Sequence, residues 1–255
     1  MKKIIALIIL VSSFAQAQFY KIEYEVRPQI KITAKALESL NKHVKDKKER
    51  EKALESIEKI DTLFYTFSYN TDMSQTSIVE KIDNSQNYFN DGMKISPKIN
   101  GNSLVNYKDS LFYYEHDFND KYLLVYDSIN YVNFTDTGKT KTILGIETKE
   151  VIGKYKDIDV LAWYAPSIPY PYSPDLFYGT KGLILELHYK YIHEINDLEI
   201  MISWIPTKKK ELRKEPVFKM NNKLPKVSKS ELTKMQENKA IEFKELMNQG
   251  VDKKD

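Results

Sequence analysis

The chain of 255 residues contains no cysteine, which excludes disulfide bonds, thiolate nucleophiles, cysteine-ligated zinc and iron–sulfur clusters. It has only eight glycines, and none of them forms a G-x-G-x-x-G, G-x-x-x-x-G-K-[ST] or G-x-S-x-G motif. The signatures of nucleotide-binding folds and α/β-hydrolases are therefore absent. An excess of charge is missing too, because 39 Lys and Arg residues stand against 36 Asp and Glu residues. We therefore predict no nucleic-acid partner, which would require a strongly cationic surface.

Residues 1–17 have the organisation of a secretory signal peptide. Two lysines begin the segment, residues 4–11 form an unbroken apolar run, and Ala15-Gln16-Ala17 is a small-x-small cleavage site. A transmembrane anchor is the alternative, but the run is much shorter than the roughly 20 residues that span a bilayer. No later stretch is long and apolar enough to span. We expect the mature chain, 18–255, in the periplasm or outside the cell.

The mature chain begins with a strand and continues into helix. Alternating apolar and charged residues predict a half-buried antiparallel strand over 19–32. From Thr33, a suitable N-cap, helical spacing predicts one long helix or a helix pair within 33–60. Short aromatic and β-branched segments then continue to residue 207. We predict an α+β domain over 18–207 with a mainly antiparallel, strongly curved, half-barrel-like sheet and one inserted helical segment.

Turn residues divide the strand-rich region. Asn119-Asp120, Asp136-Thr137-Gly138 and Lys156-Asp157 are suited to tight hairpins. Residues 77–82 are predicted as a strand, and residues 93–102, which contain proline and glycine, as a loop.

The last part of the chain, 208–255, changes composition. Residues 208–226 are basic and contain two prolines, which predicts a solvated linker or irregular wrap. Ser228 and Glu231 have capping-box spacing, and the apolar residues that follow predict a C-terminal helix that ends near Gly250.

One region of the sequence resembles a known family. It is carried by residues 143–151 (ILGIETKEV), Ala162-Trp163-Tyr164, Ile168-Pro169 and residues 179–185 (GTKGLIL). The pattern resembles the GLPGLI family of secreted bacterial proteins, loosely over the mature chain and well over 143–187. Thr180 and Lys181 stand where that family has Leu and Pro, and Thr148 where it often has Cys. The resemblance implies an envelope or secreted protein, with a link to outer-membrane transport as a further expectation, and it supplies no catalytic residues.

The most unusual segment is the proline-rich and aromatic stretch 163–178. Its prolines stiffen the backbone, which limits the entropy lost on binding. Its rings suit a lipid tail, a sugar or a peptide; alternatively they cap the open end of the sheet as core. Gly179 and Gly182, which follow, are expected to serve the backbone at the entry to the next strand. The residues that we predict to bind a ligand or partner are Trp163, Tyr164, Tyr170, Tyr172 and Tyr178.

Candidates for catalysis are weak. Glu186 and His188 share one face of a predicted strand and His193 follows a bend, a set with the chemistry to hold zinc. No H-E-x-x-H motif accompanies them, and exposed strand histidines explain the same pattern. Pairs such as Asp157 and Asp159 are arbitrary among 36 acidic residues, and no serine has a strained nucleophile context. We therefore predict no catalytic residue, no metal, no cofactor and no enzymatic activity.

These features together predict a non-catalytic, exported envelope accessory protein that binds a partner protein through the 163–178 loop. The alternative is a periplasmic carrier that encloses a hydrophobic small molecule in its curved sheet. A metal-assisted hydrolase is the remote third possibility, and it requires His188 and His193 to converge with an acidic residue.

Overall fold

The computed structural model describes residues 19–58, 61–79, 102–193 and 197–251, with the backbone alone for 56–58, 193 and 243–251. The predicted signal peptide and residues 93–101 of the predicted loop lie outside the described residues. Among the described residues, no helix is both long and apolar enough to cross a membrane.

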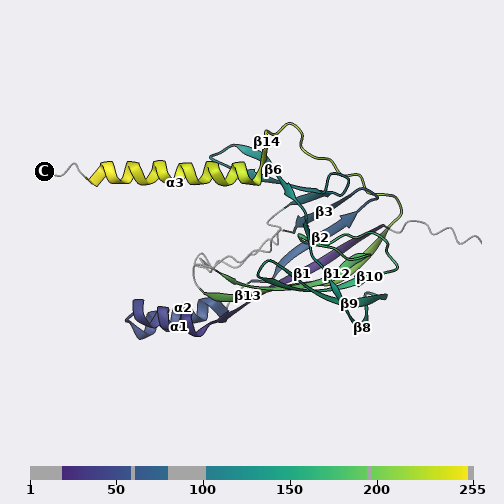
Figure 1. Ribbon diagram of the computed structural model, residues 1–255, viewed down its shortest axis with the longest axis horizontal. Helices are drawn as coiled ribbons and strands as arrows, with labels where there is room; N and C mark the ends of the chain where they lie inside the picture. Colours follow the sequence, from purple (N-terminus) through teal and green to yellow (C-terminus); the bar gives the residue numbers. More distant parts are fainter. Residues whose placement is uncertain (1–18, 59–60, 80–101, 194–196, 252–255) are drawn as a thin grey trace, which may run out of the picture.

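Most of the chain forms one open sheet of twelve strands (Figure 1). The strand order is β14-β6-β5-β4-β3-β2-β1-β13-β12-β10-β9-β8, and its neighbours are antiparallel except β14 and β6. The prediction of a mainly antiparallel sheet is confirmed; β8 and β14 are its edges, so it does not close into a barrel. The strands are β1 (Phe19–Ile32), β2 (Leu63–Tyr69), β3 (Met73–Ile78), β4 (Ser103–Asn106), β5 (Leu111–Asp117), β6 (Tyr122–Ser128), β8 (Thr135–Ile143), β9 (Ile146–Tyr155), β10 (Ile158–Ala165), β12 (Leu183–His193), β13 (Leu198–Leu212) and β14 (Lys226–Ser228). A separate parallel pair joins β7 (Asn130–Tyr131) to β11 (Phe177–Tyr178).

The described residues form three helices, which extend from the same side of the sheet in Figure 1. α1 (Ala34–His43) and α2 (Lys47–Glu58) form a pair after β1. The predicted cap is confirmed, because the Thr33 hydroxyl accepts from the Ala36 amide at 3.1 Å. α3 (Lys229–Val251) begins with the predicted capping box: Ser228 N donates to the Glu231 carboxylate at 2.7 Å, and Glu231 N donates to Ser228 Oγ at 3.2 Å.

Alternation along the strands gives the sheet two distinct faces. On the inner face, Tyr24, Tyr65 and Trp204 are buried, with ring contacts from Trp204 to both tyrosines. The segment 166–178 covers this face and adds its own apolar side chains to the core. The outer face is more polar on β1, where Arg27 and Glu25 form an ion pair at 2.6 Å.

One strand is longer than the sequence indicates. β13 continues to Leu212 because residues 208–212 pair with residues 19–23 of β1. The predicted boundary between 207 and 208 therefore falls inside a strand, and the irregular wrap begins only after Leu212. β3 begins at Met73, before the predicted strand 77–82, and ends at Ile78; residues 80–82 lie outside the described residues.

The turns agree with prediction at two of three places. Asn119-Asp120 connects β5 to β6, and Lys156-Asp157 connects β9 to β10. The third prediction is wrong: Asp136-Thr137-Gly138 is a register irregularity within β8 rather than a hairpin turn. The turn to β9 lies instead at Leu144 and Gly145, both with positive φ.

Candidate functional site

Two predicted binding residues, Tyr172 and Tyr178, lie inside the molecule. Their exposed fractions are 2% and 1%. The Tyr172 ring stacks on Tyr107 with centroids 3.7 Å apart, and its hydroxyl donates to the Thr71 carbonyl oxygen at 2.7 Å. Burial raises the pKa of Tyr178, so this phenol stays neutral. Both rings therefore contribute to the core, the alternative role considered for this loop.

Of the other three predicted residues, only Tyr170 joins this buried group, with its ring centroid 5.4 Å from that of Tyr172. Tyr170 is half-buried beside Tyr69, with ring centroids 5.5 Å apart. Trp163 pairs in register with Glu186, and Lys141 Nζ lies 4.2 Å from the centroid of its ring. Tyr164 is half-buried and follows the register irregularity after Trp163. No common exposed platform unites the five aromatic residues.

A buried carboxylate holds the aromatic loop against the sheet. Asp175 is fully buried, and its Oδ2 accepts from the Tyr189 hydroxyl at 2.8 Å and from Trp204 Nε1 at 3.0 Å. Its Oδ1 accepts from the Leu176 amide at 2.7 Å. Sequence reasoning missed Asp175, because its side-chain partners lie on two other strands, 14 and 29 residues further along the chain. Buried polar oxygens are stable only with such partners, so Asp175 serves as the loop's anchor.

Gly179 and Gly182 allow close contacts between backbone segments at the entry to β12, as predicted. Gly179 has φ +132°, and a Cβ there would lie 2.2 Å from the Val132 carbonyl oxygen. A Cβ at Gly182 would lie equally close, 2.2 Å, to the Ala165 carbonyl oxygen. The loop and β12 thus approach neighbouring backbone too closely for any side chain.

A hydrogen-bonded network of polar side chains, which we term the polar chain, crosses the outer face of the sheet. Lys141 Nζ donates to Glu186 Oε1 at 2.7 Å, and the same oxygen lies 2.8 Å from His188 Nε2. The other ring nitrogen, His188 Nδ1, lies 2.9 Å from Ser203 Oγ. Sequence reasoning found Glu186 and His188 but missed Ser203, since only the register of β12 and β13 sets Ser203 opposite His188.

This arrangement favours a charged Glu186. Burial acts to raise the pKa of Glu186, but the hydrogen bonds from His188 and Lys141 outweigh it and hold the pKa below its usual value. When His188 Nε2 donates to Glu186, its Nδ1 can accept a hydrogen bond from the Ser203 hydroxyl. The His188 imidazole therefore bridges Ser203 and Glu186 by two hydrogen bonds.

The same geometry does not provide the rest of a nucleophilic site. Ser203 is 7% exposed and lies mid-strand on β13, between β1 and β12. A central strand commits its N–H groups to its two neighbours, so they are not directed at a developing oxyanion. No group of three metal-binding side chains occurs among the described residues, and the His193 side chain lies outside them. The polar chain is accounted for as a cross-strand network.

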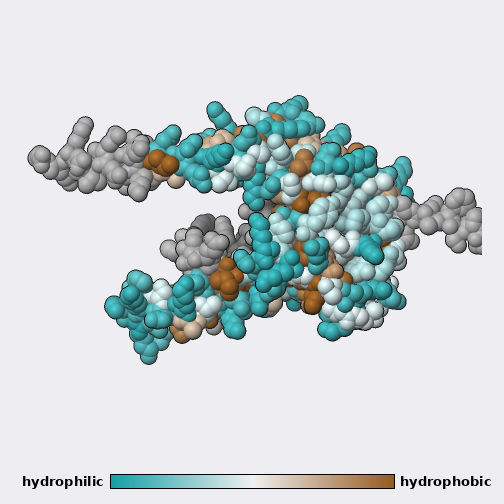
Figure 2. All heavy atoms as spheres, in the orientation of Figure 1, coloured by the Kyte–Doolittle hydropathy of each residue, from teal (hydrophilic) through white to brown (hydrophobic). Residues whose placement is uncertain are grey.

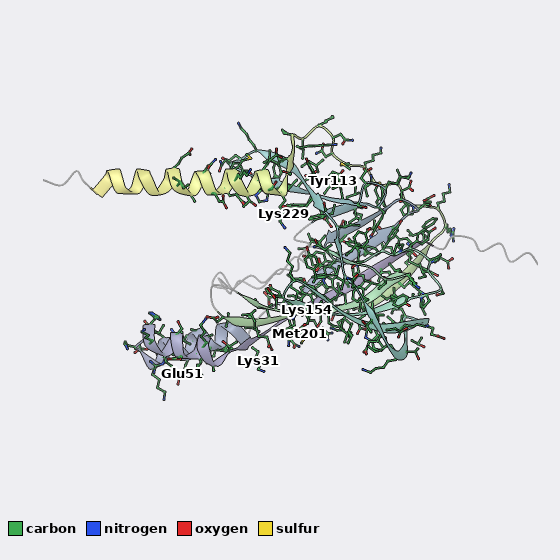
Figure 3. The ribbon with its side chains drawn as sticks, in the orientation of Figure 1. Lys31, Glu51, Tyr113, Lys154, Met201 and Lys229 are labelled. Carbon is green, nitrogen blue, oxygen red and sulfur yellow. The ribbon has the colours of Figure 1, made fainter. Side chains whose placement is uncertain are left out.

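An open groove of about 590 Å³ lies beside this network and extends across β8, β9, β10, β12 and β13. Ile152, Leu161 and Met201 give it apolar walls, and Ile152 is 47% exposed. Figure 3 labels Lys154 and Met201, which line the groove from different strands and lie close together at the lower part of the sheet. Figure 2 shows apolar residues reaching the surface in this lower region. The groove is therefore an apolar surface open to water.

Charged residues border the groove. Lys154 and Asp159 form a loose pair at 3.8 Å, and Lys190 lies 3.9 Å from Glu199. His188 also lines the groove, so the polar chain meets the apolar walls there. A ligand with an apolar body and polar flanks fits this lining.

The nearby sheet edge is protected against pairing with another strand. The edge strand β8 is interrupted between Asp136 and Thr140 and carries Lys139, whose Nζ lies 2.9 Å from Glu150. Irregularities and lysines are devices that block edge-to-edge pairing. Recognition here is therefore expected through side chains in the groove rather than through strand addition.

Comparisons with known proteins leave the chain without an assigned family. No family model matches it, and no curated protein matches it significantly. Two crystal structures of PNGF-II, in space groups C2 and P21, match with 17% and 15% sequence identity and a TM-score of 0.48 each. They cover 85% and 86% of this chain, which spans about a third of their length. A likeness this distant carries no argument about the site.

Proposed function

We propose that this protein is an exported, non-catalytic accessory protein of the cell envelope that holds an apolar segment of a partner protein in the outer-face groove. The groove with its exposed Ile152 is the observation that carries this proposal. Apolar surface that stays open to water is stabilised when a partner covers it, by about 25 cal/mol for each Å² removed from water. The paired charges around it suit the polar rim of an interface.

In this proposal the partner contacts the groove rather than the aromatic loop. Two of the five residues predicted to make a contact at the loop, Tyr172 and Tyr178, are buried. The carrier alternative would require a half-barrel-like hollow on the inner face, and the 166–178 segment lies against that face. The alternative is a carrier function in which a hydrophobic small molecule occupies the outer-face groove. The test below distinguishes that function from binding of a partner protein.

Export rests on the signal-peptide pattern of residues 1–17 and on the resemblance to the GLPGLI family. The same resemblance favours a partner in outer-membrane transport. Mass spectrometry of the protein from its own envelope is expected to find a chain that begins at Gln18.

The groove is tested by placing a photo-crosslinking amino acid at Met201, with Ile192 as the control position. Ile192 is 50% exposed and belongs to the neighbouring strand β12 but does not line the groove. We expect one discrete polypeptide adduct from position 201 in the native envelope, and none from position 192. The adduct is expected to fall severalfold in the Ile152→Gln background but not in the Ile192→Gln background.

Three results would overturn the proposal. Equal adducts from both positions would show non-specific contact, and no adduct from position 201 would show an empty groove. An adduct with the mass of a lipid or another small molecule would replace partner binding by the carrier function.

A further inference from the structure

A second pocket lies on the other half of the sheet, beneath the segment 213–225, which we term the strap. The strap leaves the end of β13 and reaches β14, and Figure 1 shows it in olive green along the β3 and β6 end of the sheet. It has no helix or strand of its own. An irregular segment that crosses a sheet face leaves space beneath it unless its side chains fill that space.

Hydrogen bonds fasten the strap at both ends. At its start, the Glu215 carboxylate accepts from the Thr71 amide at 2.8 Å and from the Thr71 hydroxyl at 2.6 Å. Asn70 Nδ2 donates to the Pro216 carbonyl oxygen at 3.0 Å. At its end, the Leu124 amide donates to the Pro225 carbonyl oxygen at 2.9 Å. The space beneath the strap is therefore a fixed feature of the fold.

The pocket has a volume of about 380 Å³, within the range of roughly 300–1,000 Å³ typical of small-molecule sites. Register pairs Gln75 with Leu104 and Leu104 with Tyr113, so these three share the outer face. Glu115 and Tyr122 belong to the same face by strand alternation. Figure 3 labels Tyr113 in the upper part of the molecule, near the strap.

The two sides of the pocket differ in chemistry. The sheet contributes tyrosine rings: Tyr113 is 8% exposed, whereas Tyr122 is 58% exposed. The strap contributes Lys219, Met220 and Asn221, and Asn221 Nδ2 donates to Glu115 Oε1 at 3.3 Å. Ring faces therefore stand beside amide and carboxylate groups within one small space.

This combination matches one ligand class. The C–H faces of a sugar ring pack against aromatic rings, while its hydroxyls exchange hydrogen bonds with amides and carboxylates, which supply both donors and acceptors. A phosphate or a nucleotide would need several cations, and Lys219 is the one cationic side chain in the described lining. A lipid tail would need apolar walls, whereas Gln75, Glu115 and Asn221 are polar.

We propose that the pocket beneath the strap binds a neutral saccharide, with Tyr122 as the exposed ring on which the sugar packs and Gln75, Glu115 and Asn221 as its hydrogen-bonding groups. This inference is independent of the proposed function, because the groove lies on β8, β9, β10, β12 and β13 and the pocket on β3–β6. The site requires no chemical step.

The test is binding of the labelled full chain to a printed array of neutral and acidic glycans, followed by titration of the strongest ligand. The Tyr122→Ala variant is expected to bind about tenfold more weakly, as removal of one ring contact implies. Tyr131→Ala is the matched control, because Tyr131 is 61% exposed and lies on β7, outside the pocket. It is expected to bind like the parent. Equal thermal unfolding of both variants and the parent would exclude a folding defect.

Binding to neutral glycans that is lost in Tyr122→Ala and kept in Tyr131→Ala supports the inference. No binding to the array, binding to acidic glycans alone, or equal effects of the two substitutions would overturn it. None of these results changes the expected crosslink at Met201, so the two proposals fail separately.

Discussion

Replacing Asp175 by Ala is expected to detach the aromatic loop from the sheet. Asp175 is fully buried and accepts from Tyr189 and Trp204, which are 2% and 0% exposed. The substitution removes the carboxylate partner of two buried side-chain donors, and each loss costs about 1–3 kcal/mol. We therefore expect the free energy of unfolding to fall by about 2–6 kcal/mol. This is a large part of the roughly 5–15 kcal/mol typical of a folded domain.

Equilibrium unfolding in urea, followed by tryptophan fluorescence, measures this change, since Trp204 itself loses a hydrogen bond. Tyr189 and Trp204 donate to the same carboxylate oxygen, so the amide oxygen of Asp175→Asn can keep both bonds and only the acceptor of the Leu176 amide is lost. This variant is expected to lose about 1–3 kcal/mol, which leaves a measurable protein if the alanine variant does not fold. Asp159→Ala is the control, because its side chain is 60% exposed and its loose pair with Lys154 contributes less than about 1 kcal/mol. If Asp175→Ala and Asp159→Ala unfolded alike, Asp175 would not be the anchor of the loop.

Two further predictions concern Glu186 and the glycines. Glu186→Gln is expected to destabilise the protein by about 1–2 kcal/mol at pH 7, because the charged form accepts from His188 and Lys141. The native state lowers the pKa of Glu186, so this stabilisation is present above the ordinary value of 4.5 and is lost as the pH falls below it. Urea unfolding at pH 7 and pH 3 checks this, and an equal difference at both pH values would contradict it. Gly182→Ala is expected to lower the melting temperature more than Gly145→Ala, since only at Gly182 would the new Cβ meet backbone, at 2.2 Å; the opposite order would refute the reasoning.

Features set by neighbouring residues could be predicted from the sequence. Alternation over 19–32 predicted β1 with the bounds that the structure has. Thr33 and the pair Ser228 and Glu231 form the predicted caps, because a cap depends on groups within three residues. The same local chemistry was misleading at 136–138, where residues typical of a turn form an irregularity inside a strand.

Features set by distant residues could not be predicted. Residues 208–212 show no strand-like alternation, and they are a strand because β1 pairs with them. The aromatic loop has the same composition whether exposed or buried, and its burial depends on Asp175 meeting Trp204. The groove and the pocket likewise exist only once the strand order is fixed, since each draws its lining from strands brought together by register.

The position of β1 has a consequence for how the chain folds. β1 is the first described strand, yet it lies in the middle of the sheet, between β2 and β13. The Thr33 hydroxyl donates at 2.6 Å to the Asp197 carbonyl oxygen, 164 residues further along the chain. Pairing of β1 with β13 closes a very long loop, and strand pairing between residues so far apart in sequence is slow. One edge of β1 therefore cannot pair with β13 until residues 198–212 have been synthesised. The charged residues of β1, Lys21, Glu23, Glu25 and Arg27, oppose aggregation through this unpaired edge.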